Sequence, residues 1–153
     1  MARASFFPAD RGHRQQRLQV MDMTAKQAQD LPLADGLWSP RWAPDGRSLA
    51  TLDPSAHLCL YSLATHQRQE LTSFSVGFPS WSADGRSLYF ESGAMSQWFR
   101  LILKNRKLER LADLSGIQMD PAGFGWVGLL PNGDRISARR VNSNIYRLDF
   151  TEK

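Results

Sequence analysis

Cysteine is nearly absent: the 153-residue chain has one, Cys59. One cysteine excludes an internal disulfide framework and a zinc site built from several cysteines. Cys59 lies in the apolar run HLCLYSL, residues 57–63, so we expect it to be a small buried hydrophobe. Because no disulfide requires an oxidising compartment, cysteine usage does not decide where the protein works.

Long apolar runs are also missing. No stretch approaches 18 apolar residues, so the sequence predicts no membrane-spanning helix and no membrane partner. Residues 1–17 lack an apolar core of signal-peptide length. We therefore expect a cytoplasmic location for the chain as written, and a periplasmic or other extracytoplasmic one if it is part of a longer exported protein.

Charge is modest and scattered. The net charge is +4, and the one basic cluster is Arg11, Arg14 and Arg17 beside His13. Nucleic-acid binding needs cationic side chains gathered on one face. We expect residues 1–16 to be a poorly ordered, solvated terminus, with nucleic acid an unlikely partner. The hydrophobic share of 42% indicates that the remainder is folded.

Recognisable catalytic patterns are lacking as well. The chain has no G-x-S-x-G nucleophile motif, and none of its three histidines has HExxH spacing. The calcium-loop pattern D-x-[DN]-x-[DN]-G is absent too. We therefore expect no catalytic residue, no cofactor and no bound metal. His57 and His66 are interpreted as surface polar residues.

What the chain does contain is a repeat. The segment SPRWAPDGRSLATLD, residues 39–53, returns as FPSWSADGRSLYFES, residues 78–92, with Trp42 and Trp81 in equivalent places 39 positions apart. A weaker third copy covers residues 125–140. Repetition at about 40 residues is typical of propeller blades and would not occur in a β-sandwich.

Each copy predicts a β-hairpin. Asp-Gly and Asn-Gly dipeptides favour two-residue type I′ turns, in which both central residues have positive φ. Asp45 and Asp84 are interpreted as turn residues rather than as a ring of ligands, because Asp side chains bond to local backbone groups. The turn dipeptides are Asp45-Gly46, Asp84-Gly85 and Asn132-Gly133.

Apolar strands follow each hairpin in the same order, so that one unit is four short strands. We predict an all-β fold of β-propeller blades: two complete four-stranded antiparallel blades and partial blades at both ends. The predicted boundaries are a partial blade at 17–33, blades at 37–73 and 76–113, and a partial blade at 123–150.

The motif W-[SA]-x-D-G-R-S-L, followed by a hydrophobic strand, resembles the TolB-like, WD-repeat-like propeller family over roughly residues 17–150. Its last blades resemble those of bacterial propellers fused to winged-helix regulators or Ser/Thr kinases. The resemblance implies a sensory or protein-interaction module. Three features depart from the pattern: Ala83 replaces a turn proline, Leu130 stands near the place of a tryptophan, and the third turn is Asn-Gly.

The number of blades bears on the partners. Closed propellers have about four to eight blades, and this chain supplies roughly three. The third predicted blade lacks its outermost strand, which residues 17–23 or 28–33 could supply. Three arrangements stay open: a piece of a longer protein with further blades, a homodimer that completes a ring, or an open three-bladed wedge. In each of them the expected partner is a protein or a set of further propeller blades.

The repeated Trp42 and Trp81 are expected to pack between blades, whereas less patterned side chains are better candidates for a binding rim. The leading hypothesis is a non-enzymatic interaction or sensor module that binds a protein or small ligand. The alternative is the propeller portion of a peptidase-type hydrolase whose catalytic domain lies elsewhere. The candidate rim residues are Trp38, Arg41, Phe78, Trp98, Arg100 and Trp126.

Overall fold

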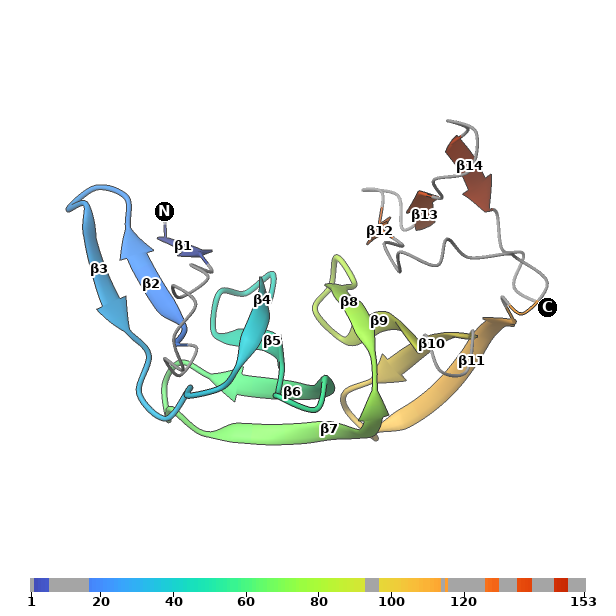
Figure 1. Cartoon of the computed structure of the whole chain (residues 1–153), viewed down its shortest axis with the longest axis horizontal. Coiled ribbons are helices and arrows are strands. Elements are labelled where there is room, and N and C mark those ends of the chain that lie inside the picture. Colours follow the sequence, from blue (N-terminus) through green and yellow to red (C-terminus); the bar gives the residue numbers. More distant parts are fainter. Residues whose placement is uncertain are drawn as a thin grey trace. The chain divides into compact units, whose positions relative to one another are not determined.

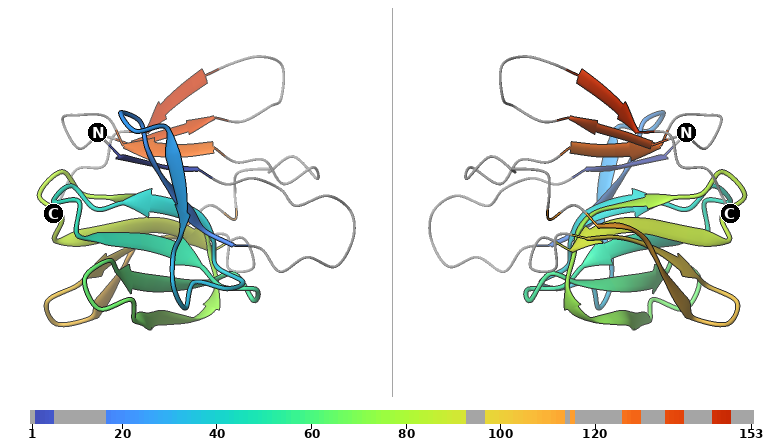
Figure 2. Two further views of the ribbon diagram at one scale, coloured as in Figure 1. Left: turned by 90° about the vertical axis from the view of Figure 1, so that its left-hand side faces the viewer. Right: turned by 90° about the vertical axis from the view of Figure 1, so that its right-hand side faces the viewer.

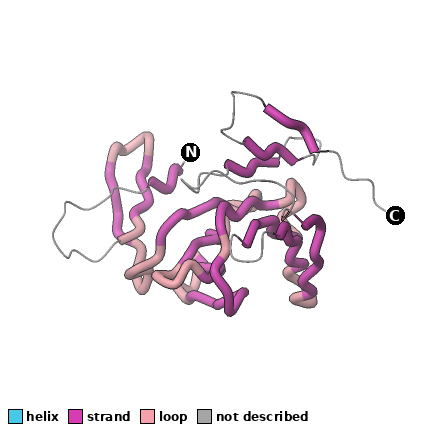
Figure 3. The backbone as a smooth tube through the Cα atoms, turned by 45° about the vertical axis from the view of Figure 1, so that its right-hand side comes forward, coloured by secondary structure: helices cyan, strands magenta, loops and turns pink. Residues whose placement is uncertain are grey.

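The structure, a computed structural model, describes residues 2–5, 17–92, 97–113, 115, 126–129, 135–138 and 145–148. Every regular element in this part of the chain is a β-strand (Figure 1; magenta in Figure 3). None of these residues belongs to a helix long and apolar enough to cross a membrane. The chain divides into two compact units, Met1–Val76 and Gly77–Lys153.

Unit 1 contains two antiparallel sheets. The first has the strand order β1-β2-β3 and the second the order β4-β5-β6-β7. The second sheet is a complete blade in which each strand pairs with the next one along the chain. The strands are β1 (Ala2–Ser5), β2 (Gln19–Asp22), β3 (Gln27–Asp30), β4 (Trp38–Trp42), β5 (Ser48–Leu52), β6 (His57–Ser62) and β7 (Arg68–Ser75).

Unit 2 repeats this plan with one complete blade and one partial blade. The complete blade has the order β8-β9-β10-β11, and the partial blade has the order β12-β13-β14. Figure 2 shows the antiparallel sheets from two further sides. The strands are β8 (Gly77–Trp81), β9 (Ser87–Ser92), β10 (Gln97–Ile102), β11 (Lys107–Asp113), β12 (Trp126–Leu129), β13 (Arg135–Ala138) and β14 (Ile145–Leu148). The predicted fold class, propeller blades with partial blades at both ends, is confirmed.

The terminus over residues 1–16, for which the sequence predicts poor order, contains one strand. Residues 2–5 form β1, which pairs antiparallel with β2. A physical reason is that β3 covers only one edge of β2, so the backbone groups on the other edge need partners. Residues 6–16 lie outside the described part of the chain.

The Asp-Gly hairpins form, but the predicted type I′ turn is wrong. Gly46 has a φ of +70°, whereas Asp45 is not among the residues with positive φ. The Gly46 N–H donates to the Ala43 carbonyl at 2.9 Å, so Pro44 and Asp45 are the two central residues of a tighter turn within a longer loop. Pro44 favours this turn, because its ring fixes φ near −65° at the first central position.

The second hairpin has the same turn although Ala83 stands in the place of Pro44. The Gly85 N–H donates to the Ser82 carbonyl at 3.0 Å. The Asp84 carboxylate accepts the Ser82 hydroxyl at 2.6 Å and the Arg86 N–H at 3.0 Å, and these bonds, that to Ser82 first, lower its pKa. Asp45 accepts the Arg47 N–H in the same way at 2.9 Å. The third predicted turn, Asn132-Gly133, lies outside the described residues.

The core of unit 1 lies around the central strands of its blade. Leu49 and Tyr61 are fully buried together with Cys59, and Trp42 packs against this cluster. Leu18 and Leu31, which flank the first sheet, belong to the same packing, whose full set is Leu18, Ala34, Leu37, Leu49, Cys59 and Tyr61 with Leu31, Trp42 and Leu63 against it. The expectation for Cys59 is confirmed, and burial raises the pKa of its thiol to about 11.

The Gly46 turn generates the first prediction. A Cβ at Gly46 would meet no atom within 4 Å, so only its φ of +70° penalises a larger residue. We expect Gly46→Ala to lower the free energy of unfolding by about 1–2 kcal/mol, measured by urea denaturation. Gly46→Asn is the matched control, because asparagine tolerates this conformation better, and it should cost less. Equal losses in the two variants would contradict a conformational cause.

Candidate functional site

The first strand of the blade in unit 1 begins with a β-bulge. Trp38 pairs with Leu52, but the regular register resumes only at Arg41. Between them Ser39 adopts a φ of +52°, which is uncommon for a residue other than glycine. The bulge breaks the strand pattern, and such irregularities often re-aim side chains beside functional sites.

The first strand of the blade in unit 2 has the same device. Gly77 pairs with Glu91, the register resumes at Ser80, and Phe78 between them has a φ of +50°. Phe78 lies 39 positions after Ser39, the offset of the sequence repeat. A bulky aromatic residue in the left-handed region is strained, and a structure keeps such strain only where its surroundings enforce it.

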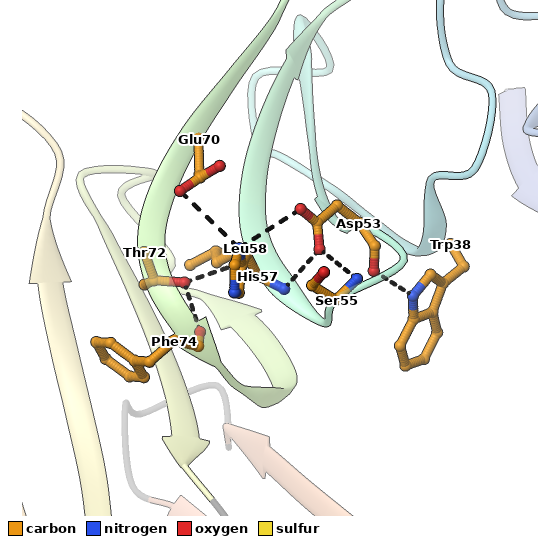
Figure 4. A network of polar contacts seen from close by, with 8 residues as sticks. All are labelled: Trp38, Asp53, Ser55, His57, Leu58, Glu70, Thr72 and Phe74. Atoms are coloured by element: carbon orange, nitrogen blue, oxygen red, sulfur yellow. Dashed lines mark hydrogen bonds and ion pairs between the residues drawn. The ribbon is translucent and has the colours of Figure 1, made fainter.

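The predicted rim residues at the bulged strand ends differ in their exposure and contacts. Trp38 is half-buried, and its indole N–H donates to the Asp53 carbonyl at 2.8 Å. Arg41 is exposed. Phe78 is half-buried and packs against Trp98. The hydrogen bond to Asp53 fixes the indole of Trp38 to the turn between β5 and β6 (Figure 4).

The structure buries one predicted rim residue, Trp98, and pairs another, Arg100, with a carboxylate. Trp98 is 1% exposed, because it lies inside the sheet opposite Glu91 and Phe78 covers it. Arg100 forms an ion pair with Glu109 of the neighbouring strand at 2.7 Å. Trp126 is the first residue of β12, and its side chain lies outside what the structure describes.

A cluster of titratable side chains lies at the same end of the unit 1 blade. The Asp53 Oδ1 atom accepts the N–H groups of Ser55 and His57, both at 2.8 Å. Its second oxygen, Oδ2, lies 3.6 Å from His57 Nδ1, and Glu70 Oε1 lies 3.9 Å from the same nitrogen. Figure 4 shows the imidazole between the two carboxylates, which come from the β5–β6 turn and from β7.

Thr72 holds the β7 part of this cluster. The pairing of β6 with β7 is irregular between the pairs Cys59–Glu70 and His57–Ser75. In this interval the Thr72 hydroxyl accepts the Leu58 N–H at 2.9 Å and donates to the Phe74 carbonyl at 3.1 Å (Figure 4). The hydroxyl thus replaces a lost ladder bond and fixes the strand that carries Glu70.

Sequence reasoning missed this cluster. Asp53 and His57 flank one predicted hairpin turn, and this spacing is a signal that could have brought them together. The approach of Glu70 depends on the irregular register of β7, which no local pattern in the sequence shows.

Glu91 is a titratable group of unit 2. It is buried, and burial raises its pKa above the ordinary value of 4.5. Its carboxylate lies beside Gly77, where a Cβ would come within 3.3 Å of Oε1. Glycine at the first position of β8 therefore leaves room for this side chain.

A depression lies in unit 1 between the β3–β4 connection and the β6–β7 turn. It has a volume of about 460 Å³ and is lined by Leu33, Asp35, His66, Gln67 and Arg68. The Tyr61 hydroxyl supports its wall by donating to the Pro32 carbonyl at 2.6 Å, and it lies 3.2 Å from His66 Nδ1.

Comparison with known proteins supports the fold. No protein-family model matches the chain. The chain is 38% identical over 58 residues to the Tol-Pal system protein TolB of Alcanivorax borkumensis, a match covering 34% of this chain and 13% of that protein. The chain therefore corresponds to a small part of this relative.

Two solved structures resemble it along most of its length. TolB from Acinetobacter baumannii has a TM-score of 0.62 at 24% identity, covering 88% of this chain and 37% of that one. The β-propeller domain of the Trilobed protease from Pyrococcus furiosus has a TM-score of 0.61 at 14% identity, covering 99% and 52%. The chain has a TolB-like β-propeller fold, and it spans about one third to one half of these structures.

Thr72 generates a prediction for the scaffold of the cluster. Thr72→Val removes the acceptor of the buried Leu58 N–H, and we expect the free energy of unfolding to fall by about 1–3 kcal/mol. Thr72→Ser keeps the hydroxyl and should lose less. The measurement is chemical denaturation of both variants. If serine and valine destabilise equally, the hydroxyl has no such role.

Glu91 generates a prediction with an opposite control. Because its pKa is raised in the folded state, its ionisation opposes folding as the pH rises above 4.5. Glu91→Gln should therefore be more stable than the wild type at pH 7, and this advantage should shrink as the pH falls toward 4.5 and be lost below it. Hydrogen bonds from Lys107 and then Arg100 lower the pKa of Glu109, so Glu109→Gln should be less stable at pH 7 and the deficit should vanish in acid. Thermal unfolding across pH gives both signs, and equal signs would contradict the assignment.

Proposed function

We propose that the chain is a non-enzymatic β-propeller module that binds a protein or a small ligand at the bulged end of a blade's first strand, which is β4 in unit 1 and β8 in unit 2. The observation that carries this proposal is the strained residue repeated at one blade position, Ser39 in one unit and Phe78 in the other. Two different residue types in the same unfavourable conformation indicate that the blade enforces the bulge. Strain of this kind clusters at binding sites.

The location agrees with how propellers are used. Their blades surround a central channel, and binding residues concentrate in the segments that join strands. Arg41 follows the first bulge and is exposed on the edge strand β4, where it offers a positive charge to a partner. Trp38 and Phe78 supply aromatic surface at the same ends of the two strands.

The sequence contains no recognisable catalytic pattern, and this supports binding over catalysis. The TolB-like fold hosts more than one function, so the fold alone does not decide between them. We further propose that the chain works within a larger regulatory assembly, in which additional blades from the same polypeptide or from a second copy complete the ring. Support for this part comes from the four to eight blades of closed propellers.

A charge reversal at the rim tests the proposal. Cross-linking in cells that express the chain first identifies the partner. The purified partner is then titrated with the Arg41→Glu and Arg47→Glu variants. The control makes the same charge change in the Asp-Gly turn of the same blade, away from the bulge. We expect Kd to rise at least about tenfold, or ~1.4 kcal/mol, for Arg41→Glu and to change little for Arg47→Glu.

Two outcomes would contradict the proposal. If both variants weaken a partner equally, the binding surface does not lie at the bulged end. If the purified chain hydrolyses peptide or ester substrates in proportion to its folded fraction, it is not a non-enzymatic module.

A further inference from the structure

We infer that Asp53, His57 and Glu70 form a binding site for one divalent transition-metal ion, for which Zn²⁺ is the best chemical match. One imidazole nitrogen and two carboxylate oxygens are a ligand set that zinc accepts. Each of the three residues offers one ligand atom, and these atoms all lie within 4.8 Å of one another.

The distances favour a shared ion over direct hydrogen bonds. The His57 Nδ1 atom lies 3.6 Å from Asp53 Oδ2 and 3.9 Å from Glu70 Oε1. Both separations exceed the usual hydrogen-bond range of about 2.7–3.2 Å. Two ligands at about 2.0–2.2 Å from a tetrahedral ion lie roughly 3.4 Å apart, so small side-chain shifts bring all three atoms to coordination distance.

The Asp53 carboxylate is oriented for this role. Its Oδ1 is already held by the Ser55 and His57 N–H groups at 2.8 Å, which leaves Oδ2 directed at the imidazole (Figure 4). The Asp53 carbonyl is fixed in turn by the Trp38 indole. Hydrogen bonds that position a ligand in this way lower the cost of ordering it around an ion.

The blade in unit 2 shows that the fold does not require these three residues. By strand register and repeat offset, Ser92 stands in the place of Asp53, Gln97 in that of His57, and Arg110 opposite Phe99 in that of Glu70 opposite Cys59. This set has no imidazole and no carboxylate. Central strands with the same pairing therefore form in unit 2 without a metal-binding group at these positions.

The site is accessible to an ion from solvent. The side chains of His57, Asp53 and Glu70 are 27%, 18% and 56% exposed. Three protein ligands leave a fourth tetrahedral position open, which water or a group of a binding partner would fill. A bound ion would tie the β5–β6 turn to β7, next to the bulge at Trp38.

The test uses the chain stripped of metal with a chelator and then dialysed against Zn²⁺. Zinc retained per chain is measured by elemental analysis, and Co²⁺ serves as a visible-absorbance probe of the ligand geometry. We expect one equivalent of zinc at this site. The His57→Gln variant, which carries the residue of the second blade, and the Glu70→Gln variant should each weaken binding at least about tenfold.

Matched controls separate the site from adventitious binding. His66→Gln removes another imidazole from the same unit, and Glu109→Gln removes a carboxylate from unit 2, and neither should change the zinc affinity. Glu70 is largely exposed, so its variant tests the site even if His57→Gln fails to fold. Failure of the wild type to retain zinc, or equal retention by Glu70→Gln and Glu109→Gln, would overturn the inference. A zinc loss confined to His66→Gln would also do so.

Discussion

The central strands of the two complete blades bury side chains on both faces, and the rest of the structure depends on this constraint. Residues 49–52 of β5 are all buried, although alternate side chains point to opposite sides of the sheet. A sheet of this kind cannot leave one face in water, as a half-buried antiparallel sheet does. In unit 1, Leu18 and Leu31 supply part of the cover. Polar groups consequently remain accessible at the strand ends and edges.

The blades could be predicted from the sequence because their signals are local and repeated. Trp42 and Trp81 with their Asp-Gly turns recur at a fixed offset, and each turn is followed by a strand of the expected length. The turn type could not be predicted from the dipeptide alone. In the first turn, Pro44 restricts φ at the position before Asp45. The second turn has the same geometry without a proline.

The candidate site was predictable only in part. The sequence predicts Trp38 and Phe78 as rim residues because they are less regularly repeated than Trp42 and Trp81. In the structure they lie at the bulged strand ends. The sequence predicts Trp98 in the same rim, because it does not show that Phe78 packs against this side chain. Glu70 was not considered, since its position beside His57 depends on an irregular pairing of β6 with β7 that Thr72 stabilises. Long-range register of this kind is set by packing rather than by local pattern.

The repeated bulge has a consequence for how these blades diverge. An extra residue in the edge strand is absorbed before the ladder resumes at Arg41 and Ser80, so the side chains ahead of it do not determine the register of the sheet. The same position accommodates Trp-Ser in one blade and Gly-Phe in the other. Substitutions at this point can therefore change the side chains at the strand end while the hydrophobic alternation of the blade stays in phase.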